Sequence, residues 1–417
     1  MTAPTLALDF GTSNSAAALL VDRRVRRLEI EAGADTLPTA VFLPTDGADM
    51  RIGAAAEAAL TGDEDGRYMR ALKSVLGTPL FHEDRLIAGK RRTLGDIVTA
   101  FLAEVKARAE AAAGIPFANV LSGRPVHFHS DDASRDARAE EDLRACYLAA
   151  GFNKVDFIFE PEAAAHATRT TEAREETRLI VDIGGGTSDF SVVLLGADRV
   201  DVMASHGIRL GGTDFDHAVS MAHAMPQLGL GGELRRAFGE GLLPVPRALF
   251  VDLSTWAMIP FLYSRDTERM VADLVRHAVE PAPLERLATV IEHRLGHDLA
   301  FAVERGKIAA NMGTPNARID MTCVERGVAV PITAGTLNAA LTPYRDGLRT
   351  ALYETLFHAR VTPADIASVV LVGGSSLMSL VEDETRAVCP GARLIRSDAF
   401  TAVVDGIALA TRLSGRR

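Results

Sequence analysis

The sequence has few cysteines and no long apolar segment. Its three cysteines, Cys146, Cys323 and Cys389, are far apart and odd in number, so they indicate neither a disulfide framework nor a zinc site. No apolar run approaches the roughly 18 residues of a membrane-spanning helix. The first residues, MTAPTLALDFG, lack the basic and long apolar regions of a signal peptide. We therefore expect a cytoplasmic protein without a membrane partner.

An excess of positive charge is missing as well. The 45 Lys and Arg residues face 55 Asp and Glu residues, which gives a net charge of −10. Proteins that bind nucleic acid through its phosphates concentrate positive charge, so no nucleic-acid partner is expected. Neither the Walker pattern G-x-x-x-x-G-K-[ST] nor a G-x-G-x-x-G between a strand and a helix occurs, which excludes two common nucleotide-binding folds.

One short pattern is present twice in the 417 residues. Residues 5–21 (TLALDFGTSNSAAALLV) and 178–195 (RLIVDIGGGTSDFSVVLL) each run from an apolar segment into Asp, through a turn with Gly, Thr and Ser, into a second apolar segment. The two aspartates are Asp9 and Asp182. This pattern predicts two β-hairpins, and it predicts a chain of two lobes that each begin with the same hairpin.

The turns of these hairpins suit phosphate. Tight glycine turns present backbone N–H groups that bind anions, and an Asp at a strand end is a natural oxygen partner for Mg²⁺. Alone, the first turn is more typical of a plain hairpin than of a phosphate site. The three consecutive glycines 184–186 favour close approach of a polyphosphate, because ordering them is entropically costly. A third segment, Gly373-Gly374-Ser375-Ser376, follows an apolar strand and indicates either a simple N-capped turn or a ring- or phosphate-binding turn.

The remaining pattern gives a provisional division of the chain. Helical periodicity covers 95–113 and 133–150, and a strand is predicted at 119–123. The polar stretch 168–178 is the best boundary between lobes. We predict lobe I at 1–170, with 395–417 returning to it, and lobe II at 171–394, including a helical insertion at about 217–311.

Together, the motifs resemble those of the actin/hexokinase/heat-shock ATPase superfamily. Asp9–Ser13, Asp182–Asp189 and Leu371–Ser376 resemble its two phosphate motifs and its adenosine motif. Further segments resemble those of the 70-kDa heat-shock chaperones: Glu160–Ala165 and Asp405–Ala410 their connecting helices, Leu210–Asp216 the turn after the second hairpin, and Ala71–Lys73 with Gly77 the segment of their phosphate-contacting lysine.

This resemblance implies an α/β, two-lobed actin-like ATPase with duplicated ribonuclease-H-like sheets and helical insertions. It implies binding of ATP and ADP with Mg²⁺, and slow ATP hydrolysis coupled to lobe closure. A protein client or co-chaperone is implied as a further partner. The family's peptide-binding β-sandwich and lid have no counterpart after the second connecting helix, so we expect a short member without that clamp.

The site residues follow by position in the family motifs. Lys73 would orient the γ-phosphate, Glu160 and Asp189 would polarise the attacking water, and Asp182, the fourth catalytic residue, would hold Mg²⁺ together with Asp9. The implied phosphate-binding residues are Asp9, Gly11, Thr12, Ser13, Asn14, Gly184, Gly185, Gly186 and Thr187. The implied nucleoside-binding residues are Gly211, Gly212, Glu304, Lys307, Ile308, Gly373, Gly374, Ser375 and Leu377.

Some positions depart from the family, and alternatives stay open. Ile308 and Leu377 stand where the family sandwiches adenine between two arginines, and Arg124, within a Ser-Gly-Arg-Pro turn, could face the cleft. Lys73 could be an ordinary solvated lysine, and Glu160 an acid at the start of a helix. A small-molecule kinase on the same fold, or a nucleotide-gated interaction module with negligible hydrolysis, remains an alternative function.

Overall fold

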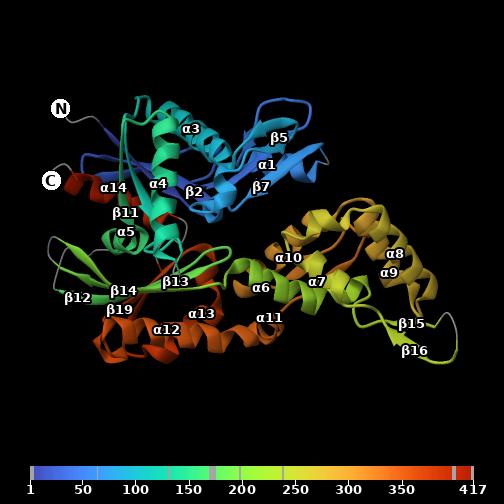
Figure 1. The fold of residues 1–417 in the computed structure, drawn as a ribbon. Coiled ribbons are helices and arrows are strands. Elements are labelled where there is room, and N and C mark those ends of the chain that lie inside the picture. The colour runs from blue at the N-terminus through green and yellow to red at the C-terminus, as the bar shows by residue number, and fades with distance from the viewer. Residues whose placement is uncertain are drawn as a thin grey trace. The chain divides into compact units, whose positions relative to one another are not determined.

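The chain folds into two compact units (Figure 1). The computed structural model describes residues 4–62, 64–129, 132–168, 175–196, 199–236, 239–396 and 401–414. The first unit comprises Met1–Leu210, Leu348–Leu377 and Val381–Arg417, and the second comprises Gly211–Gly347 and Met378–Leu380. The predicted boundary stretch 168–178 lies partly outside the described residues, and the predicted lobe limits stay predictions.

The first hairpin is the centre of one sheet of the first unit. Its strand order is β11-β10-β1-β2-β3. The bounds are β1 (Thr5–Phe10), β2 (Asn14–Val21), β3 (Arg24–Leu28), β10 (Asn119–Arg124) and β11 (Lys154–Phe159). β1 and β2 are antiparallel, with Asp9 opposite Ala16, whereas β10 and β11 continue the sheet in parallel. The predicted hairpin at 5–21 is confirmed.

The second hairpin is the centre of another sheet with the same scheme. Its order is β14-β13-β12-β19-β20, from β12 (Glu176–Ile183), β13 (Ser188–Leu195), β14 (Val200–Ile208), β19 (Ser368–Val372) and β20 (Arg393–Arg396). β12 and β13 are antiparallel, with Asp182 opposite Asp189, and β19 and β20 add in parallel. The pattern seen twice in the sequence is therefore repeated as a whole sheet, and the predicted α/β fold class is confirmed.

Two helices cross inside the first unit. They are α5 (Glu160–Ala167) and α14 (Ala402–Ser414). A Cβ atom on Gly406 would lie only 1.8 Å from Ala163 O, so the helix backbones touch there and glycine is required. One apolar cluster joins both helices to both sheets, and it includes Ala7, Ala164, Ile180, Val370 and Ile407.

A second core lies on the other side of β1. Its strand residues Leu6, Leu8 and Phe10 alternate with Ala7, so they point to the opposite face of the sheet. There they pack in one cluster with residues of α3 (Leu94–Ala113) and α4 (Ala133–Ala149). Asp132 caps the N-terminus of α4 by accepting backbone N–H bonds from its first turn. The predicted helices and the strand at 119–123 are confirmed.

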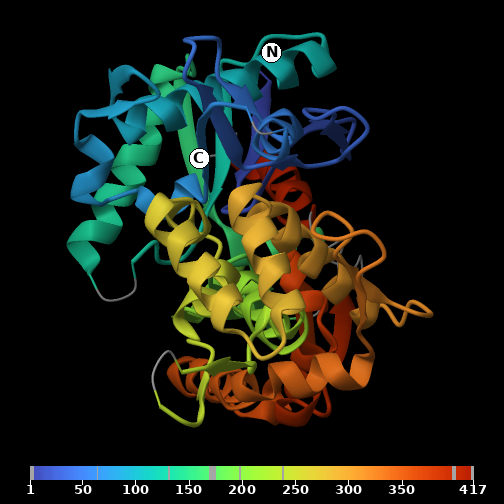
Figure 2. The same ribbon diagram turned by 90° about the vertical axis from the view of Figure 1, so that its right-hand side faces the viewer.

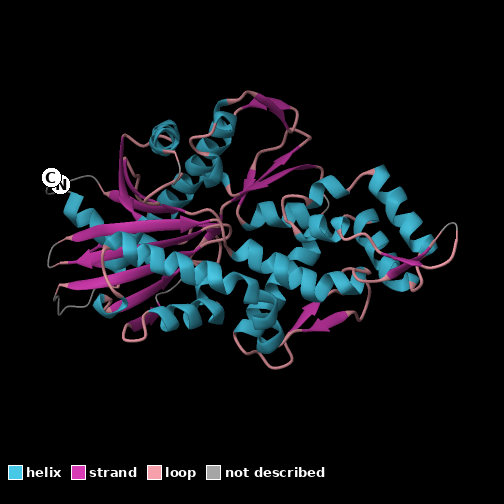
Figure 3. Cartoon of the chain, turned by 60° about the horizontal axis from the view of Figure 1, so that its bottom comes forward, coloured by secondary structure: helices cyan, strands magenta, loops and turns pink. Residues whose placement is uncertain are grey.

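The second unit is mostly helical, as the yellow and orange helices in Figure 2 show. Its helices are α6 (Gly212–Val219), α7 (Ala248–Ser254), α8 (Arg265–His277), α9 (Pro281–Glu292), α10 (Gly296–Asn311) and α11 (Ala334–Leu341). Two short hairpins, β15 (Glu233–Arg235) with β16 (Leu242–Pro244) and β17 (Arg318–Asp320) with β18 (Ala329–Pro331), complete it. The cartoon in Figure 3 shows the contrast between long strands in the first unit and short ones here.

The remaining described strands and α-helices have the following bounds. They are β4 (Leu37–Pro38), β5 (Ala40–Pro44), β6 (Arg51–Ile52), α1 (Ala54–Thr61), β7 (Gly66–Arg70), α2 (Pro79–His82), β8 (Arg85–Ile87), β9 (Lys90–Arg92), α12 (Arg345–Ala359) and α13 (Ser379–Val388). Among the described helices, none has the length and apolar composition needed to cross a membrane.

Candidate nucleotide site

The turn of the first hairpin is held in one conformation by its own backbone and by a neighbouring residue. A Cβ atom on Gly11 would lie 2.2 Å from Asn14 O, so glycine is required in this turn. Thr39 donates its backbone N–H to Ser13 O over 2.8 Å. The hydroxyls of Thr39 and Ser15 also lie 2.8 Å apart. The protein itself therefore fixes the turn.

The turn of the second hairpin meets the first. Gly184 donates its backbone N–H to Thr187 O over 3.0 Å, which closes the turn. A Cβ atom on Gly185 would lie 2.5 Å from Ser13 Oγ, whereas a Cβ atom on Gly186 would have no atom within 4 Å. The two turns are thus in contact within the first unit, and open space lies beside Gly186.

The third glycine motif packs on the strand that carries Asp182. Gly373 has a positive φ of 80°, and a Cβ atom there would lie 2.6 Å from Asp182 Oδ1 and 2.5 Å from Ile183 O. The backbone N–H and the hydroxyl of Ser376 both donate to Gly373 O, at 3.1 and 2.7 Å. Only glycine has both the conformation and the size that this turn requires.

Lys73 and Glu160 form a short, largely enclosed ion pair. Lys73 lies on a 3₁₀ turn, Leu72–Val75, and Glu160 is the first residue of α5. Lys73 Nζ is 2.5 Å from Glu160 Oε1, and the two side chains are 9% and 15% exposed. Burial alone would lower the pKa of the amine, but the carboxylates of Glu160 and Asp9 outweigh it and raise the pKa of Lys73. Lys73 is therefore a charged residue held by a carboxylate, not a solvated one.

Three aspartates at strand ends interact electrostatically with this pair. Burial, followed by the Glu160 carboxylate, raises the pKa of Asp9 to about 7, although Lys73 opposes the shift. The same two causes raise the pKa of Asp189 to about 7. For Asp182, burial and the neighbouring carboxylates raise the pKa well above its ordinary value. Four carboxylates share one lysine, an excess of negative charge that a bound cation would relieve.

This set of donors fits magnesium. Mg²⁺ usually keeps several waters and is held by one or two carboxylates together with phosphate oxygens. Asp9 and Asp182 are hard oxygen donors at adjoining strand ends, and a bound cation would oppose the burial and the neighbouring carboxylates that raise their pKa values. Within the described ranges, no group of three or more His, Cys, Asp and Glu side chains forms a metal-ligand cluster. A water-mediated magnesium site does not require one.

A pocket opens beside the same carboxylates. Its lining includes Glu160, Asp182 and Asp189 together with Pro125 and Val126, which directly follow β10. On the side of the second sheet, the hydroxyls of Ser191 and Ser205 lie 2.9 Å apart and also line it. The pocket thus has an acidic wall and a wall formed by the loop after β10.

The predicted nucleoside-binding residues belong to both units. Gly211 precedes α6 and donates its backbone N–H to Asp214 Oδ2 over 2.8 Å. On α10, Lys307 is buried and its Nζ lies 2.7 Å from Asp216 Oδ1, while Ile308 is 46% exposed. These residues, with Gly212 and Glu304, lie in the second unit, and Gly373, Gly374, Ser375 and Leu377 lie in the first.

Comparison with known proteins supports the resemblance. The family model described as Hsp70 protein matches residues 83–228. The chaperone protein DnaK of Cenarchaeum symbiosum is 27% identical over 413 residues, which cover 98% of this chain. These two matches support the Hsp70 family for this chain. A chaperone protein HscA homolog of Burkholderia multivorans is 28% identical over 432 residues, again covering 98% of the chain.

The Hsp70 relatives are longer than this chain. The alignments cover 54% of the DnaK protein and 58% of the HscA homolog. A further HscA homolog, from Aromatoleum aromaticum, is 35% identical over 227 residues, which are 50% of this chain and 35% of that protein. The predicted family is confirmed, and it supports a nucleotide-binding, chaperone-type ATPase. The activity, nucleotide and partners of this chain are proposed below.

Some residues of this candidate site cannot be predicted from the sequence. Asp216 pairs with Lys307; it stands in the motif Leu210–Asp216, but nothing local indicated its partner. The contact of Thr39 with the first turn joins residues 26 positions apart, and Thr39 carries no motif. Arg124 stood out as unusual, but its ion pairs with α4 were not indicated.

Proposed function

We propose that this Hsp70-family chain binds Mg·ATP and hydrolyses it slowly, with the two hairpin turns holding the phosphates. The observation that carries the proposal is the close approach of Gly185 to Ser13. Two glycine turns that meet bring backbone N–H groups to one place, which suits a polyphosphate. The proposed cradle consists of Asp9, Gly11, Thr12, Ser13, Asn14, Gly184, Gly185, Gly186 and Thr187.

The charged residues supply the chemistry of phosphoryl transfer, which depends on positioning and charge stabilisation. Lys73 donates to a γ-phosphate oxygen and neutralises its charge. Glu160 and Asp189 accept hydrogen bonds from the attacking water. The water oxygen bonds to the γ-phosphorus, the bond to the β,γ-bridging oxygen breaks, and the water proton passes to a carboxylate. A pKa of about 7 at Asp189 suits a proton acceptor near neutral pH.

Asp9 and Asp182 would hold magnesium through water molecules. When bound, the ion supplies positive charge to the phosphates. Gly373 packs against the carboxylate of Asp182, which has room there because glycine has no side chain. This packing restrains the Asp182 side chain next to the last residue of β12.

For the nucleoside, we propose Gly211, Gly212, Glu304, Lys307 and Ile308, together with Gly373, Gly374, Ser375 and Leu377. Ile308, in the second unit, is 46% exposed and Leu377, in the first, is 41% exposed, and each side chain offers a purine ring an apolar contact. They lack the cation–π attraction of arginine, about 0.5–2 kcal/mol. The apolar residues at these two positions favour a second candidate function, a nucleotide-gated interaction module with negligible hydrolysis.

The proposed cellular role follows the family. A cytoplasmic location, lobe closure coupled to hydrolysis, and a protein client or co-chaperone as partner are parts of the same proposal. Their support is the match to DnaK and HscA chaperones along 98% of this chain. Closure would be tested by small-angle scattering with and without Mg·ATP, where a smaller radius of gyration is expected with nucleotide.

Calorimetric titration of ATP and ADP with Mg²⁺, with phosphate release followed in parallel, tests the function. The variants are wild type, Asp182→Asn and the control Asp201→Asn, whose carboxylate on β14 pairs with Arg199 and is 46% exposed. Asparagine has the shape of aspartate, so the packing against Gly373 is kept. We expect Asp182→Asn to lower phosphate release by about 10²-fold or more, and the control to match wild type. Binding without release supports the gated module, and no binding overturns both.

A further inference from the structure

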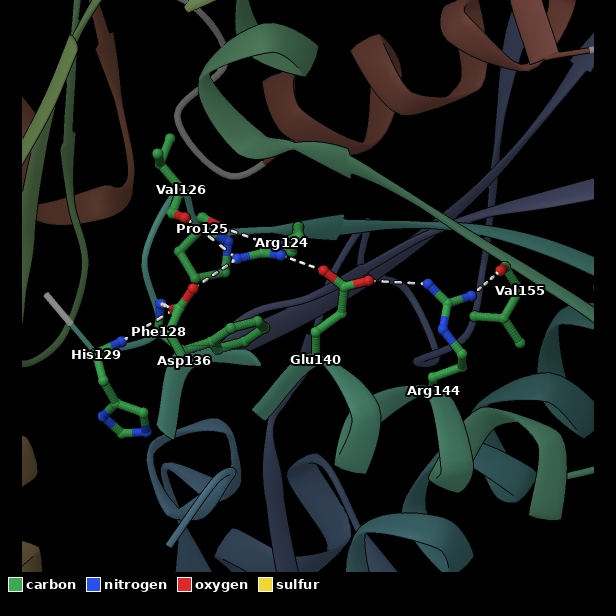
Figure 4. A network of polar contacts seen from close by, with 9 residues as sticks. All are labelled: Arg124, Pro125, Val126, Phe128, His129, Asp136, Glu140, Arg144 and Val155. Carbon is green, nitrogen blue, oxygen red and sulfur yellow. Dashed lines mark hydrogen bonds and ion pairs between the residues drawn. The ribbon is translucent and has the colours of Figure 1, made fainter. Parts of the chain in front are cut away.

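Arg124, at the end of β10, is the centre of a polar network that the proposed mechanism does not use (Figure 4). Its Nε donates to Pro125 O over 3.0 Å and its Nη2 to Val126 O over 3.1 Å. Its Nη1 donates to Glu140 of α4. The side chain is only 11% exposed. One guanidinium therefore sets the course of the loop after β10, whose first two residues line the acidic pocket.

The guanidinium also lies over two aromatic rings. It is 5.1 Å from the ring centre of Phe128 and 5.3 Å from that of Phe159. Phe159 ends β11 and directly precedes Glu160. An enclosed cation over an aromatic face is attracted to it. Arg124 therefore restrains Phe159, the residue that directly precedes α5 and Glu160.

The loop that Arg124 holds also contacts the segment that carries Lys73. Asp136 pairs with Arg124 at 3.4 Å, and its other oxygen accepts the backbone N–H groups of Phe128 and His129 at 2.5 and 3.3 Å. His129 Nε2 is 2.8 Å from Leu76 O. Leu76 follows the 3₁₀ turn that carries Lys73. A continuous set of contacts thus leads from Arg124 to the base of the lysine.

We propose that Arg124 is a positioning residue for the Lys73–Glu160 ion pair. It acts on Glu160 through Phe159, and on Lys73 through the loop 125–129 and Leu76. The inference rests on the proposed function, because the pair acts in catalysis only if the chain hydrolyses ATP. Arginine suits this position because its planar fork bonds two carboxylates and two carbonyls while it stacks on rings, which lysine cannot do.

The variant Arg124→Met should fold, because the partners of Arg124 keep other contacts. Asp136 still accepts the two backbone N–H groups of the loop. Glu140 keeps Arg144, whose Nη2 donates to it over 2.9 Å. Methionine also keeps an unbranched side chain of similar length beside the two rings. The unfolding transition measured by circular dichroism verifies that each variant is folded before the other readouts are compared.

The chain offers a matched control in Arg144. This arginine also bonds Glu140, lies 4.8 Å from the ring centre of Phe157, and donates to the carbonyl of Val155. It is on the same helix as Asp136 and Glu140, yet its contacts lie along α4 and β11, away from the loop 125–129. Arg144→Met therefore removes a similar set of interactions without releasing the loop.

The experiment compares wild type, Arg124→Met, Arg124→Lys and Arg144→Met. ATP hydrolysis gives kcat and KM, and amide hydrogen exchange by mass spectrometry follows residues 72–77, 124–129 and 158–161. Misplacing catalytic groups by about 1 Å costs on the order of 10²-fold. We expect Arg124→Met to lower kcat by roughly 10- to 100-fold with KM nearly unchanged, and to speed exchange in all three segments. Arg124→Lys should recover only part of kcat, and Arg144→Met should match wild type.

Two results would overturn the inference: unchanged kcat and exchange in Arg124→Met, or an equal loss in Arg144→Met. If the wild type hydrolyses no ATP, the proposed function fails, and hydrogen exchange decides the positioning role by itself. Faster exchange at 72–77 and 158–161 in Arg124→Met alone would then uphold the positioning role, and unchanged exchange would reject it.

Discussion

Gly185 lies so close to Ser13 that a Cβ atom on Gly185 would be 2.5 Å from Ser13 Oγ. Ser13 belongs to the turn between β1 and β2, and Gly185 to the turn between β12 and β13. Each turn is at the end of a hairpin, and the two hairpins are at the same position in sheets of the same strand order. Two copies of one structural pattern thus end at one place, where we propose that phosphates bind.

This contact predicts a coupling between the two turns. Gly185→Ala should lower the free energy of unfolding by about 1 kcal/mol, because the new Cβ forces the Ser13 hydroxyl into another rotamer. In the Ser13→Ala background the hydroxyl is absent, and the loss should be smaller. Urea unfolding of the two single variants and the double variant measures the coupling. Equal losses in both backgrounds would show that the turns do not meet.

Gly186 provides the complementary prediction. A Cβ atom there would have no protein atom within 4 Å, so Gly186→Ala should leave the stability of the nucleotide-free protein unchanged. If the phosphates occupy the open space, the same methyl group should weaken binding of Mg·ATP by about tenfold or more, which is about 1.4 kcal/mol. Calorimetry compares the two proteins. Unchanged affinity would place the phosphates away from this glycine.

The Lys73–Glu160 ion pair predicts that single variants at the two residues lose different amounts of stability. Lys73→Met leaves the carboxylates without their shared cation, so it should destabilise the protein more than Glu160→Gln does. Each variant should lower phosphate release by about 10²-fold or more, and Lys73→Met/Glu160→Gln should regain part of the stability. Lys90→Met, at an exposed lysine that donates to Gly47 O, is the control. Wild-type release by Lys73→Met would contradict the assignment.

Because the pKa of Asp189 is raised, we expect that replacing its carboxyl group by an amide stabilises the protein by an amount that depends on pH. The carboxyl titrates near pH 3.9 in an unfolded chain and at about 7 in the folded protein. Between these values the folded protein binds more protons than the unfolded chain, so its stability falls as pH rises. Each pH unit of this interval costs up to about 1.4 kcal/mol.

Asp189→Asn cannot ionise and avoids that loss. It should be more stable than wild type at about pH 8, and the difference should shrink as the pH falls toward 4. Thermal unfolding at a series of pH values, with Asp201→Asn beside it, measures the effect. A stability difference that stays constant with pH would mean that Asp189 has an ordinary pKa.

The hairpins could be predicted from sequence because their signals are local. The Asp, the glycine turn and the apolar segments on each side stand within 18 consecutive residues, and the structure has β1–β2 and β12–β13 there. The parallel partners could not be predicted in the same way. The pairing of β12 with β19 joins Asp182 to Val372, and such distant register depends on the packing of the whole sheet.

Contacts between individual side chains also could not be predicted from the sequence. Lys73 and Glu160 were each singled out by family position, but their ion pair depends on how a 3₁₀ turn and α5 are placed. The contact of Gly406 with Ala163 O likewise depends on the crossing of two helices. The sequence marks Arg124 only as a departure from the family, because its partners come from an adjoining helix and from two aromatic residues.

The most direct test is a crystal structure of the chain with Mg²⁺ and a non-hydrolysable ATP analogue. We expect phosphate oxygens within about 3 Å of backbone nitrogen atoms from both turns, Gly11–Asn14 and Gly184–Thr187, with Lys73 Nζ at the γ-phosphate. A nucleotide held by one turn alone, or bound elsewhere on the chain, would contradict the account.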